Sequence, residues 1–206
     1  TTAVSRDASV SSGVALISVD DDAQNSIVVV PGANGQVGQQ EIDQLEQLLP
    51  EAKVLLLQLE IPFSVVETVV SLANQHSVLV ILDPAPAHPL PHMLYSKLDF
   101  LTPNEIETAQ LVGFDINTIE DAKRAVDQFV SWGVSHPIVK MGAQGAVFGG
   151  GTNGTQLANP FAVNAIDSTA AGDAFNGGMA AALAAGASFH QSVMQGMAAG
   201  ALATTK

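Results

Sequence analysis

The sequence contains no cysteine and little positive charge. Of its 206 residues, 7 are Lys or Arg and 20 are Asp or Glu, which gives a formal net charge of -13 at pH 7. Without cysteine, neither a disulfide framework nor a thiolate metal site can form, and we expect a reducing compartment, the cytoplasm. The acidic balance repels nucleic-acid phosphates and anionic lipid headgroups, so we expect neither nucleic acid nor a membrane as a partner.

Long hydrophobic runs are lacking as well. The first residues contain no apolar stretch of the signal-peptide kind, and the longest weakly polar run, residues 177–187, is too short to span a bilayer. A high apolar fraction is present: 47% of residues are hydrophobic and only 13% are charged. This composition predicts a compact globular body with a buried core and no membrane span.

The order of the apolar patterns predicts an α/β fold. Two β-branched runs, residues 13–19 and 26–30, flank an acidic turn and indicate a β-hairpin. Helical spacing follows around Ile42, Leu45 and Leu48, and strand and helix patterns then alternate. We expect strands at 54–59, 78–82, 99–102, 137–140, 145–148 and 161–166, and helices at 63–75, 104–112, 119–132 and from 172 onward. Such alternation is typical of a mostly parallel sheet with helices on both faces.

In folds of this kind, ligands bind beyond the carboxyl ends of the strands. The functional loops are therefore expected after Leu59, Leu82, Leu101, Lys140 and Ile166. An acidic protein that binds a polyanion there needs backbone amides, a few cations or a divalent metal to offset its charge.

Residues 167–178, Asp-Ser-Thr-Ala-Ala-Gly-Asp-Ala-Phe-Asn-Gly-Gly, meet that need. Small residues at 170–172 at the start of an Ala-rich helix let successive N–H groups approach an anion closely. Asp173, at the end of the same turn, is placed to accept a proton from a hydroxyl that attacks a phosphoryl group. The alternative is an ordinary capped helix start, with Asp167 or Asp173 as the cap.

The whole string resembles the C-terminal signature of the ribokinase family of carbohydrate kinases, the phosphofructokinase B superfamily. The family pattern is Asp-Thr-Thr-Ala/Gly-Ala-Gly-Asp-x-Phe, and Ser168 in place of the first Thr is the single departure. The resemblance implies a Rossmann-like fold and phosphoryl transfer from ATP to a sugar hydroxyl. It implies Asp173 as the catalytic base and an anion hole made by the amides of Ala170, Ala171, Gly172 and Asp173.

Two further segments agree with this family in order and spacing. Asn104 and Glu107, in Thr-Pro-Asn-Glu-Ile-Glu, resemble its Asn-x-x-Glu segment and imply an Mg²⁺ site that they hold mostly through water. They also have the spacing of a helix N-cap and its capping-box partner, and both interpretations can hold together. Residues 138–145 resemble the nucleotide loop, where Gly142 and Gly145 allow close approach to ATP and Lys140 either adds a cation near the phosphates or points to solvent.

The resemblance also covers the acceptor side. Residues 28–34, 57–60 and 83–87 are closer to the ribose-phosphorylating members than to the fructokinases or adenosine kinases, which implies D-ribose as substrate and O5 as acceptor. Glu60 matches the acidic residue that hydrogen-bonds sugar hydroxyls, although its type and position alone would suit a surface carboxylate. Asp167 and the backbone at Thr169 match positions that line a monovalent-cation site, for K⁺. Another sugar or nucleoside kinase and a noncatalytic nucleotide-binding fragment remain as alternatives, whereas no Gly-x-Gly-x-x-Gly supports a dinucleotide-dependent oxidoreductase.

Against the family pattern, residues 1–35 correspond to part of a small β lid with its connecting strands. Residues 36–206 correspond to the α/β nucleotide-binding and catalytic domain. The sequence begins after the family's leading strands, which help to hold the sugar, and ends before a C-terminal stretch near the adenine. We therefore expect this stretch alone to bind nucleotide weakly and to be poorly active, and the intact protein to form a homodimer through the lid.

Overall fold

The computed structural model describes residues 4–19, 25–150 and 154–205. A six-stranded sheet forms its centre, in the order β3-β4-β5-β6-β7-β8. Strands β3 (Val54–Leu57), β4 (Leu79–Leu82), β5 (Phe100–Leu101) and β6 (His136–Lys140) run parallel, and β7 (Ala146–Phe148) and β8 (Gln156–Ala158) are antiparallel. The predicted mostly parallel sheet is confirmed.

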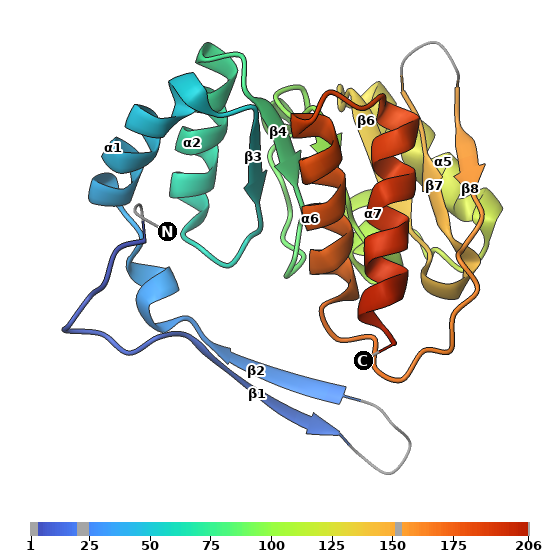
Figure 1. Cartoon of the computed structure of the whole chain (residues 1–206), viewed down its shortest axis with the longest axis horizontal. Coiled ribbons are helices and arrows are strands. Elements are labelled where there is room, and N and C mark those ends of the chain that lie inside the picture. Colours follow the sequence, from blue (N-terminus) through green and yellow to red (C-terminus); the bar gives the residue numbers. More distant parts are fainter. Residues whose placement is uncertain (1–3, 20–24, 151–153, 206) are drawn as a thin grey trace.

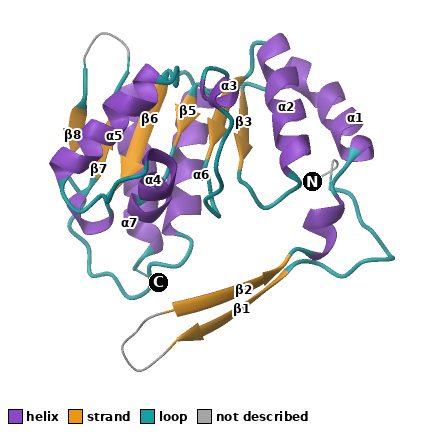
Figure 2. Cartoon of the chain, turned by 180° about the vertical axis from the view of Figure 1, so that it is seen from behind, coloured by secondary structure: helices purple, strands orange, loops and turns teal. Residues whose placement is uncertain are grey.

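Helices cover both faces of this sheet (Figures 1 and 2). Helices α2 (Phe63–Gln75), α3 (His92–Tyr95), α4 (Glu105–Val112) and α5 (Ile119–Ser131) lie on one face, and α6 (Ala171–Ala184) and α7 (Phe189–Ala203) lie on the other. Helix α1 (Gln39–Leu48) packs on α2 through Ile42, Val65 and Val69. Short 3-10 turns, η1 (Gly32–Gln36), η2 (Leu49–Glu51) and η3 (Gly142–Gln144), complete the described elements.

Alternation along the strands divides the core into two layers. Val80 and Leu82 of β4 pack with α2 and α5, whereas Ile81 between them packs with Phe175 and Met179 of α6. Side chains that follow one another on a strand point to opposite faces, so a strand covered on both sides must be apolar at every position. The continuous apolar runs in the sequence have this cause.

Outside the sheet, β1 (Val14–Val19) and β2 (Asn25–Val30) form an antiparallel hairpin with Val14 opposite Val30. The hairpin was predicted from the sequence. It extends beneath the carboxyl ends of the parallel strands, on the side where α6 begins (Figure 1). It therefore lies at the edge of the sheet where ligands of such folds bind.

Two sequence predictions fail in the segment before α6. The expected strand at residues 161–166 is absent, and these residues are an open loop in which Ile166 is 77% exposed. The edge strand β8 was not predicted, because three residues, Gln-Leu-Ala, carry too short a pattern. The apolar side chains of the loop line a cavity, whereas the short strand β8 is held by its pairing with β7.

Candidate active site

Helix α6 begins in an unusual way at the carboxyl edge of the sheet. Ala170, its N-cap, has the left-handed backbone angles φ 58° and ψ 13°, which non-glycine residues adopt rarely. The Ala171 N–H donates to the carbonyl of Ser168 at 3.2 Å. Helix geometry leaves the N–H groups of Gly172 and Asp173 without an intrahelical acceptor, so both can bind an anion.

Of the four predicted anion-hole amides, Gly172 and Asp173 thus stand open, whereas that of Ala171 is engaged within the turn. Asp173 is the third residue of the helix and its side chain is exposed. The carboxylate lies next to the open amides, and the Asp173 side chain does not cap the helix. The sequence alternative of an Asp173 cap is therefore wrong, and Asp167 is not the N-cap residue either.

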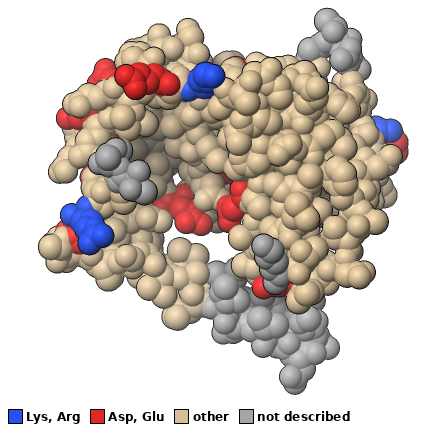
Figure 3. Space-filling view, viewed as in Figure 1, with Lys and Arg blue, Asp and Glu red and all other residues tan. Residues whose placement is uncertain are grey.

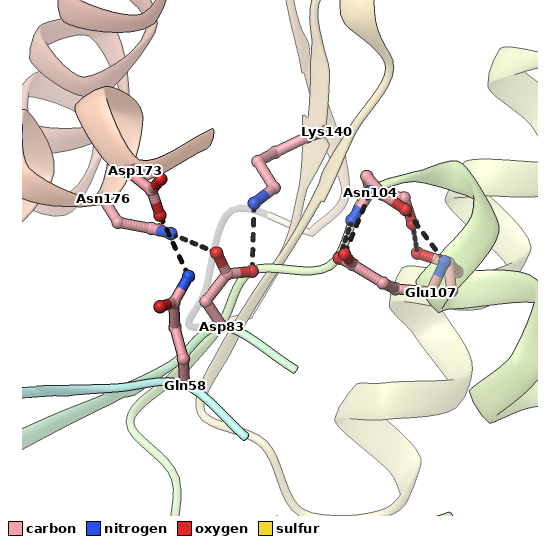
Figure 4. Close-up of polar contacts among 8 residues, drawn as sticks. Gln58, Asp83, Asn104, Glu107, Lys140, Asp173 and Asn176 are labelled. Atoms are coloured by element: carbon pink, nitrogen blue, oxygen red, sulfur yellow. Dashed lines mark hydrogen bonds and ion pairs between the residues drawn. The ribbon is translucent and has the colours of Figure 1, made fainter. Parts of the chain in front are cut away.

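Each parallel strand places a polar side chain at this edge. They are Gln58 after β3, Asp83 after β4, Thr102 after β5 and Lys140 at the end of β6. Gln58 Nε2 donates to Asp173 Oδ1 at 2.9 Å (Figure 4). The first turn of α6 is therefore held from the sheet as well as by its own backbone.

Asp83 is a buried hub of this edge. The residue is 2% exposed, and its carboxylate accepts from Asn176 Nδ2 of α6 at 2.7 Å and from Lys140 Nζ at 3.0 Å (Figure 4). The Lys140 side chain is itself only 14% exposed, so the alternative that it points to solvent is wrong. A Cβ added to Gly172 would lie 3.2 Å from Lys140 Nζ, which places this cation beside the open amides at the start of α6.

Asn104 and Glu107 form a complete capping box at the start of α4. The Asn104 Oδ1 accepts from the Glu107 N–H at 2.9 Å, and the Glu107 carboxylate accepts from the Asn104 N–H at 2.8 Å and from Nδ2 at 3.0 Å. Burial raises the pKa of the Glu107 carboxyl above its ordinary value, while the Asn104 backbone hydrogen bond opposes that shift. The capping interpretation is confirmed.

Asp167 lies on the surface just before α6. Its Oδ1 accepts from the Thr169 N–H at 2.8 Å, and its own N–H donates to the carbonyl of Thr204 at the end of α7. Hydrogen bonds from the Thr169 side chain and backbone lower the pKa of the Asp167 carboxyl. An exposed anionic carboxylate suits a monovalent cation, and the backbone at Thr169 lies close by.

A cavity of about 720 Å³ opens between η3, the loop before α6 and helix α7. Its lining includes five predicted nucleotide-site residues, Asn104, Lys140, Gly142, Gly145 and Gly172, together with apolar side chains of the loop, Phe161 and Val163, and Met197 of α7. A polar end at the start of α6 and an apolar end suit a molecule that carries phosphates and a flat base.

The two glycines of the loop after β6 differ in how much space surrounds them. Gly145 has φ +98°, and a Cβ there would lie 2.1 Å from the carbonyl oxygen of Ala158, so the fold itself requires glycine. Gly142 has φ +48°, but a Cβ would meet only Glu105 Oε1, at 3.6 Å. The space over Gly142 is thus open to a ligand in the cavity.

Glu60 lies in the bend after β3 and is exposed, and among the described residues it forms no side-chain hydrogen bond or ion pair. Asp and Glu side chains gather around a hollow in the middle of the face shown in Figure 3, and the Lys and Arg side chains visible on this face lie toward its periphery. An acidic hollow suits a neutral polyol, whose hydroxyls donate hydrogen bonds to carboxylates.

The described residues contain no group of three or more His, Cys, Asp or Glu side chains that could hold a metal ion. Mg²⁺ keeps several waters and binds substrate phosphates, so a site for it needs few direct protein ligands. Asn104, in the cavity lining, and the capped carboxylate of Glu107 suit contacts through water.

Sequence reasoning missed four side chains of this edge: Gln58, Asp83, Thr102 and Asn176. Thr102 is fully buried, and its Oγ1 and the Asn176 Oδ1 have no hydrogen-bond partner among the described residues. The rule that ligands bind at carboxyl strand ends pointed to the loops but not to these roles. Polar residues directly after apolar strands were the signal that could have found the first three.

The site combines a parallel sheet with helices on both faces, open helix amides, a buried cation beside them and an adjacent carboxylate. This combination is typical of α/β proteins that bind phosphate groups. The comparisons with known proteins place the chain within that class. Residues 1–206 match the pfkB family of carbohydrate kinases, and the chain belongs to this family.

Among curated relatives, a ribokinase of Haemophilus influenzae is 38% identical over 194 residues, which cover 94% of this chain and 63% of that protein. A deoxyribokinase of Salmonella typhi is 36% identical over 179 residues, 86% of this chain and 58% of that protein. The structure of Arabidopsis thaliana ribokinase complexed with ribose and ATP matches with a TM-score of 0.84 and 30% identity, over 94% of this chain and 63% of that one. The chain thus spans less than two thirds of the length of these relatives. No helix in the described part of the chain is long and apolar enough to cross a membrane.

Proposed function

We propose that the protein transfers the γ-phosphoryl group of ATP to a sugar, with D-ribose as substrate and O5 as acceptor. The observation that carries this proposal is the start of α6, where the Asp173 carboxylate stands beside the open amides of Gly172 and Asp173, and where Gly172 lines the cavity. Relatives that are named ribokinases, and the similarity to a ribokinase complexed with ribose and ATP, support it.

In this reaction Asp173 accepts the proton of the O5 hydroxyl as that oxygen attacks the γ-phosphorus. The bond from the γ-phosphorus to the β,γ-bridging oxygen breaks, and the products are ADP and ribose 5-phosphate. The open amides of Gly172 and Asp173, with that of Ala170, stabilise the charge on the transferred group, and Lys140 adds a cation beside them. The Ala171 amide, also expected in the anion hole, is engaged by the Ser168 carbonyl. The protein's part is alignment and charge stabilisation.

Two cations complete the proposed site. Mg²⁺, when bound, screens the phosphate charge and helps to orient the nucleotide, and Asn104 and Glu107 would hold it through water. Asp167 and the backbone at Thr169 would hold K⁺ near the same turn. Asn104, Gly142, Gly145 and Gly172 would contact the nucleotide, because they line one cavity.

Glu60 is proposed to hold sugar hydroxyls together with Asp173. The similarity to a deoxyribokinase favours 2-deoxyribose as the second candidate substrate. The two sugars differ in one hydroxyl, so a site that pairs that hydroxyl with a buried polar group would reject the deoxy sugar strongly, and one that does not would accept both. A noncatalytic nucleotide-binding role is the remaining alternative.

A panel of sugars tests this proposal. ADP release, coupled to NADH oxidation, is measured in the full-length protein that carries these residues, with ribose, 2-deoxyribose, fructose or adenosine. We expect ribose to give the highest kcat/KM and the product to carry phosphate at O5, which phosphorus NMR identifies. ATP binding without sugar-dependent ADP release would support the noncatalytic alternative and overturn the proposal.

A further inference from the structure

The carboxylate of Asp173 is hydrogen-bonded to a side chain outside the proposed catalytic and binding residues. Gln58, the residue directly after β3, donates from Nε2 to Asp173 Oδ1 at 2.9 Å. Figure 4 shows the two side chains approaching each other from the sheet edge and from the first turn of α6. The bond joins residues 115 positions apart, so the fold brings them together.

In helices α4, α5 and α7, the acidic or amide residue at the third position forms a capping box. Asp173 is the third residue of α6. The third residues of α4, α5 and α7 are Glu107, Asp121 and Gln191, and each folds back to accept from the N-cap backbone of its own helix in a capping box. Asp173 makes no such bond and turns toward β3 instead.

The hydrogen bond between Gln58 and Asp173 contributes little to the stability of the fold. It is solvent-exposed, and exposed hydrogen bonds contribute little net stability. Helix α6 is already joined to the sheet one turn further on by the buried bond from Asn176 to Asp83, at 2.7 Å. The Gln58 bond therefore adds orientation of one carboxylate more than attachment of the helix.

We propose that Gln58 is a positioning residue for phosphoryl transfer: its amide fixes Oδ1 of Asp173 so that Oδ2 faces the acceptor hydroxyl. This inference rests on the proposed function, in which Asp173 is the base. A neutral amide suits the role, because it donates a hydrogen bond without taking the proton and without cancelling the carboxylate charge. A cation there would hold the carboxylate in an ion pair, and a second carboxylate would repel it.

The test uses kinetics of the full-length protein with Gln58→Met and with the isosteric Gln58→Glu. We expect Gln58→Met to lower kcat about 10-fold, because a mispositioned group loses part of the proximity effect, with KM for ATP and sugar nearly unchanged. Gln58→Glu is expected to lower kcat further, by about 100-fold, because two carboxylates then face each other. Gln39→Met is the matched control: it removes a bond of the same kind, Gln39 Nε2 to Asp43 Oδ1 at 2.7 Å, on the exposed surface of α1, and should leave kcat unchanged.

A double-mutant cycle with Asp173→Asn distinguishes positioning from a general structural effect. If Gln58 acts through Asp173, then Gln58→Met causes no further loss once Asp173 is Asn. An equal loss in both backgrounds, or wild-type kcat in both Gln58 variants, overturns the inference. Failure of the proposed function gives a different pattern, since the wild-type protein would then show no sugar-dependent turnover or Asp173→Asn would retain it.

Discussion

At the scale of single residues, the buried pair of Asp83 and Lys140 has a direct consequence for stability. A carboxylate that is 2% exposed is stable as an anion only while a cation and hydrogen-bond donors face it. Lys140 supplies the cation and Asn176 one donor. The same cation lies beside the open amides of α6. Lys140 therefore neutralises Asp83 in the folded protein and, in the proposed reaction, also stabilises the phosphate charge.

We predict that Lys140→Met lowers the free energy of unfolding by about 3 kcal/mol, because it leaves Asp83 buried and unpaired. The double variant Asp83→Asn with Lys140→Met should regain most of that loss, since neither member of the buried pair is then charged. The surface pair Lys123–Glu120, at 2.7 Å, is the matched control, and Lys123→Met should change stability by less than about 1 kcal/mol. Urea titrations give all four values, and a loss in the double variant as large as in Lys140→Met would contradict this account.

Glu107 makes stability depend on pH with a definite sign. Burial raises its pKa above the ordinary value of 4.5, so in acid the folded state holds this proton more tightly than the unfolded chain does. The stability that this provides is fully present below the unfolded pKa and is lost as pH rises through the raised folded pKa. Glu107→Gln keeps a capping-box acceptor and removes the ionisation.

The prediction is that wild type loses stability relative to Glu107→Gln between pH 4 and pH 7. Denaturant unfolding at both pH values measures this difference directly. The difference is taken between the two proteins, so carboxyls shifted in the opposite direction, such as Asp167, cancel. A gain of wild type relative to the variant over that interval would contradict a raised pKa.

The sequence predicted the site residues that belong to local motifs. Asn104 and Glu107 are three residues apart, and their capping box depends only on that spacing. Gln58 and Asn176 could not be assigned roles in this way, because their partners lie 115 and 93 positions away and are brought together only by the sheet. The sequence also left open whether Lys140 lies near the phosphates or points to solvent, because its partner Asp83 follows β4, two strands away from β6 in the sheet.

At the scale of secondary-structure elements, α6 and α7 pack through small residues. A Cβ on Gly178 would lie 2.7 Å from the Cβ of Ala199, and one on Gly196 would lie 2.8 Å from the carbonyl oxygen of Phe175. Gly177, next to Gly178 on α6, is exposed and has open space around it. Glycine is therefore needed at position 178, where a side chain would collide with α7, but not at position 177, where there is space for one.

We predict that Gly178→Ala lowers the free energy of unfolding by about 1–3 kcal/mol through overpacking against α7. Gly177→Ala should raise it by about 0.5–1 kcal/mol, because alanine is the better helix former and meets no neighbour. Both variants change one glycine of the same helix, so each serves as the control for the other in thermal or urea unfolding. Equal effects of the two substitutions would show that the close approach of α6 and α7 is not maintained.

Long periodic segments were the elements that the sequence predicted well. Helix α2 spans Phe63–Gln75, as its apolar spacing indicated, because Val66, Val70 and Ala73 form one buried stripe. The run at 161–166 has strand-like composition but no strand neighbour, and its apolar side chains line the cavity instead. Composition alone cannot distinguish these two surroundings.

At the scale of the whole molecule, the hairpin of β1 and β2 has no packed face in the described part of the chain. Val28 and Val29 point to opposite faces of the hairpin, and both are more than half exposed, at 58% and 53%. An isolated two-stranded ribbon is only marginally stable in water, and exposed apolar strands favour pairing with other chains. We therefore propose that the hairpin is the part of the lid through which two subunits of the full-length protein associate.

Sedimentation of the full-length protein tests this proposal. Wild type is expected to form a dimer, and Val28→Lys together with Leu16→Lys, which places two cations opposite each other on one face, should shift the equilibrium to monomer. Met93→Lys, at a 78% exposed apolar position on α3, is the control and should remain dimeric. A strictly monomeric wild-type protein at high concentration would refute the dimer.

The division into a lid at residues 1–35 and a catalytic domain at 36–206 stays a prediction. The hairpin is separate from the six-stranded sheet, but the sugar site also depends on what faces the acidic hollow in the full-length protein. The same holds for the weak activity expected of residues 1–206 alone and for a cytoplasmic location.

The central claim is that Asp173 is the base in phosphoryl transfer to the sugar, and one substitution tests it most directly. In the full-length protein, Asp173→Asn keeps the shape of the side chain and the amides of α6 but cannot accept the proton. We predict that ribose-dependent ADP release falls by at least about 100-fold in kcat, while the Kd for ATP stays within a few-fold of wild type. A variant that retains near wild-type kcat would contradict the account, because the carboxylate beside the open amides of α6 would then have no part in the chemistry.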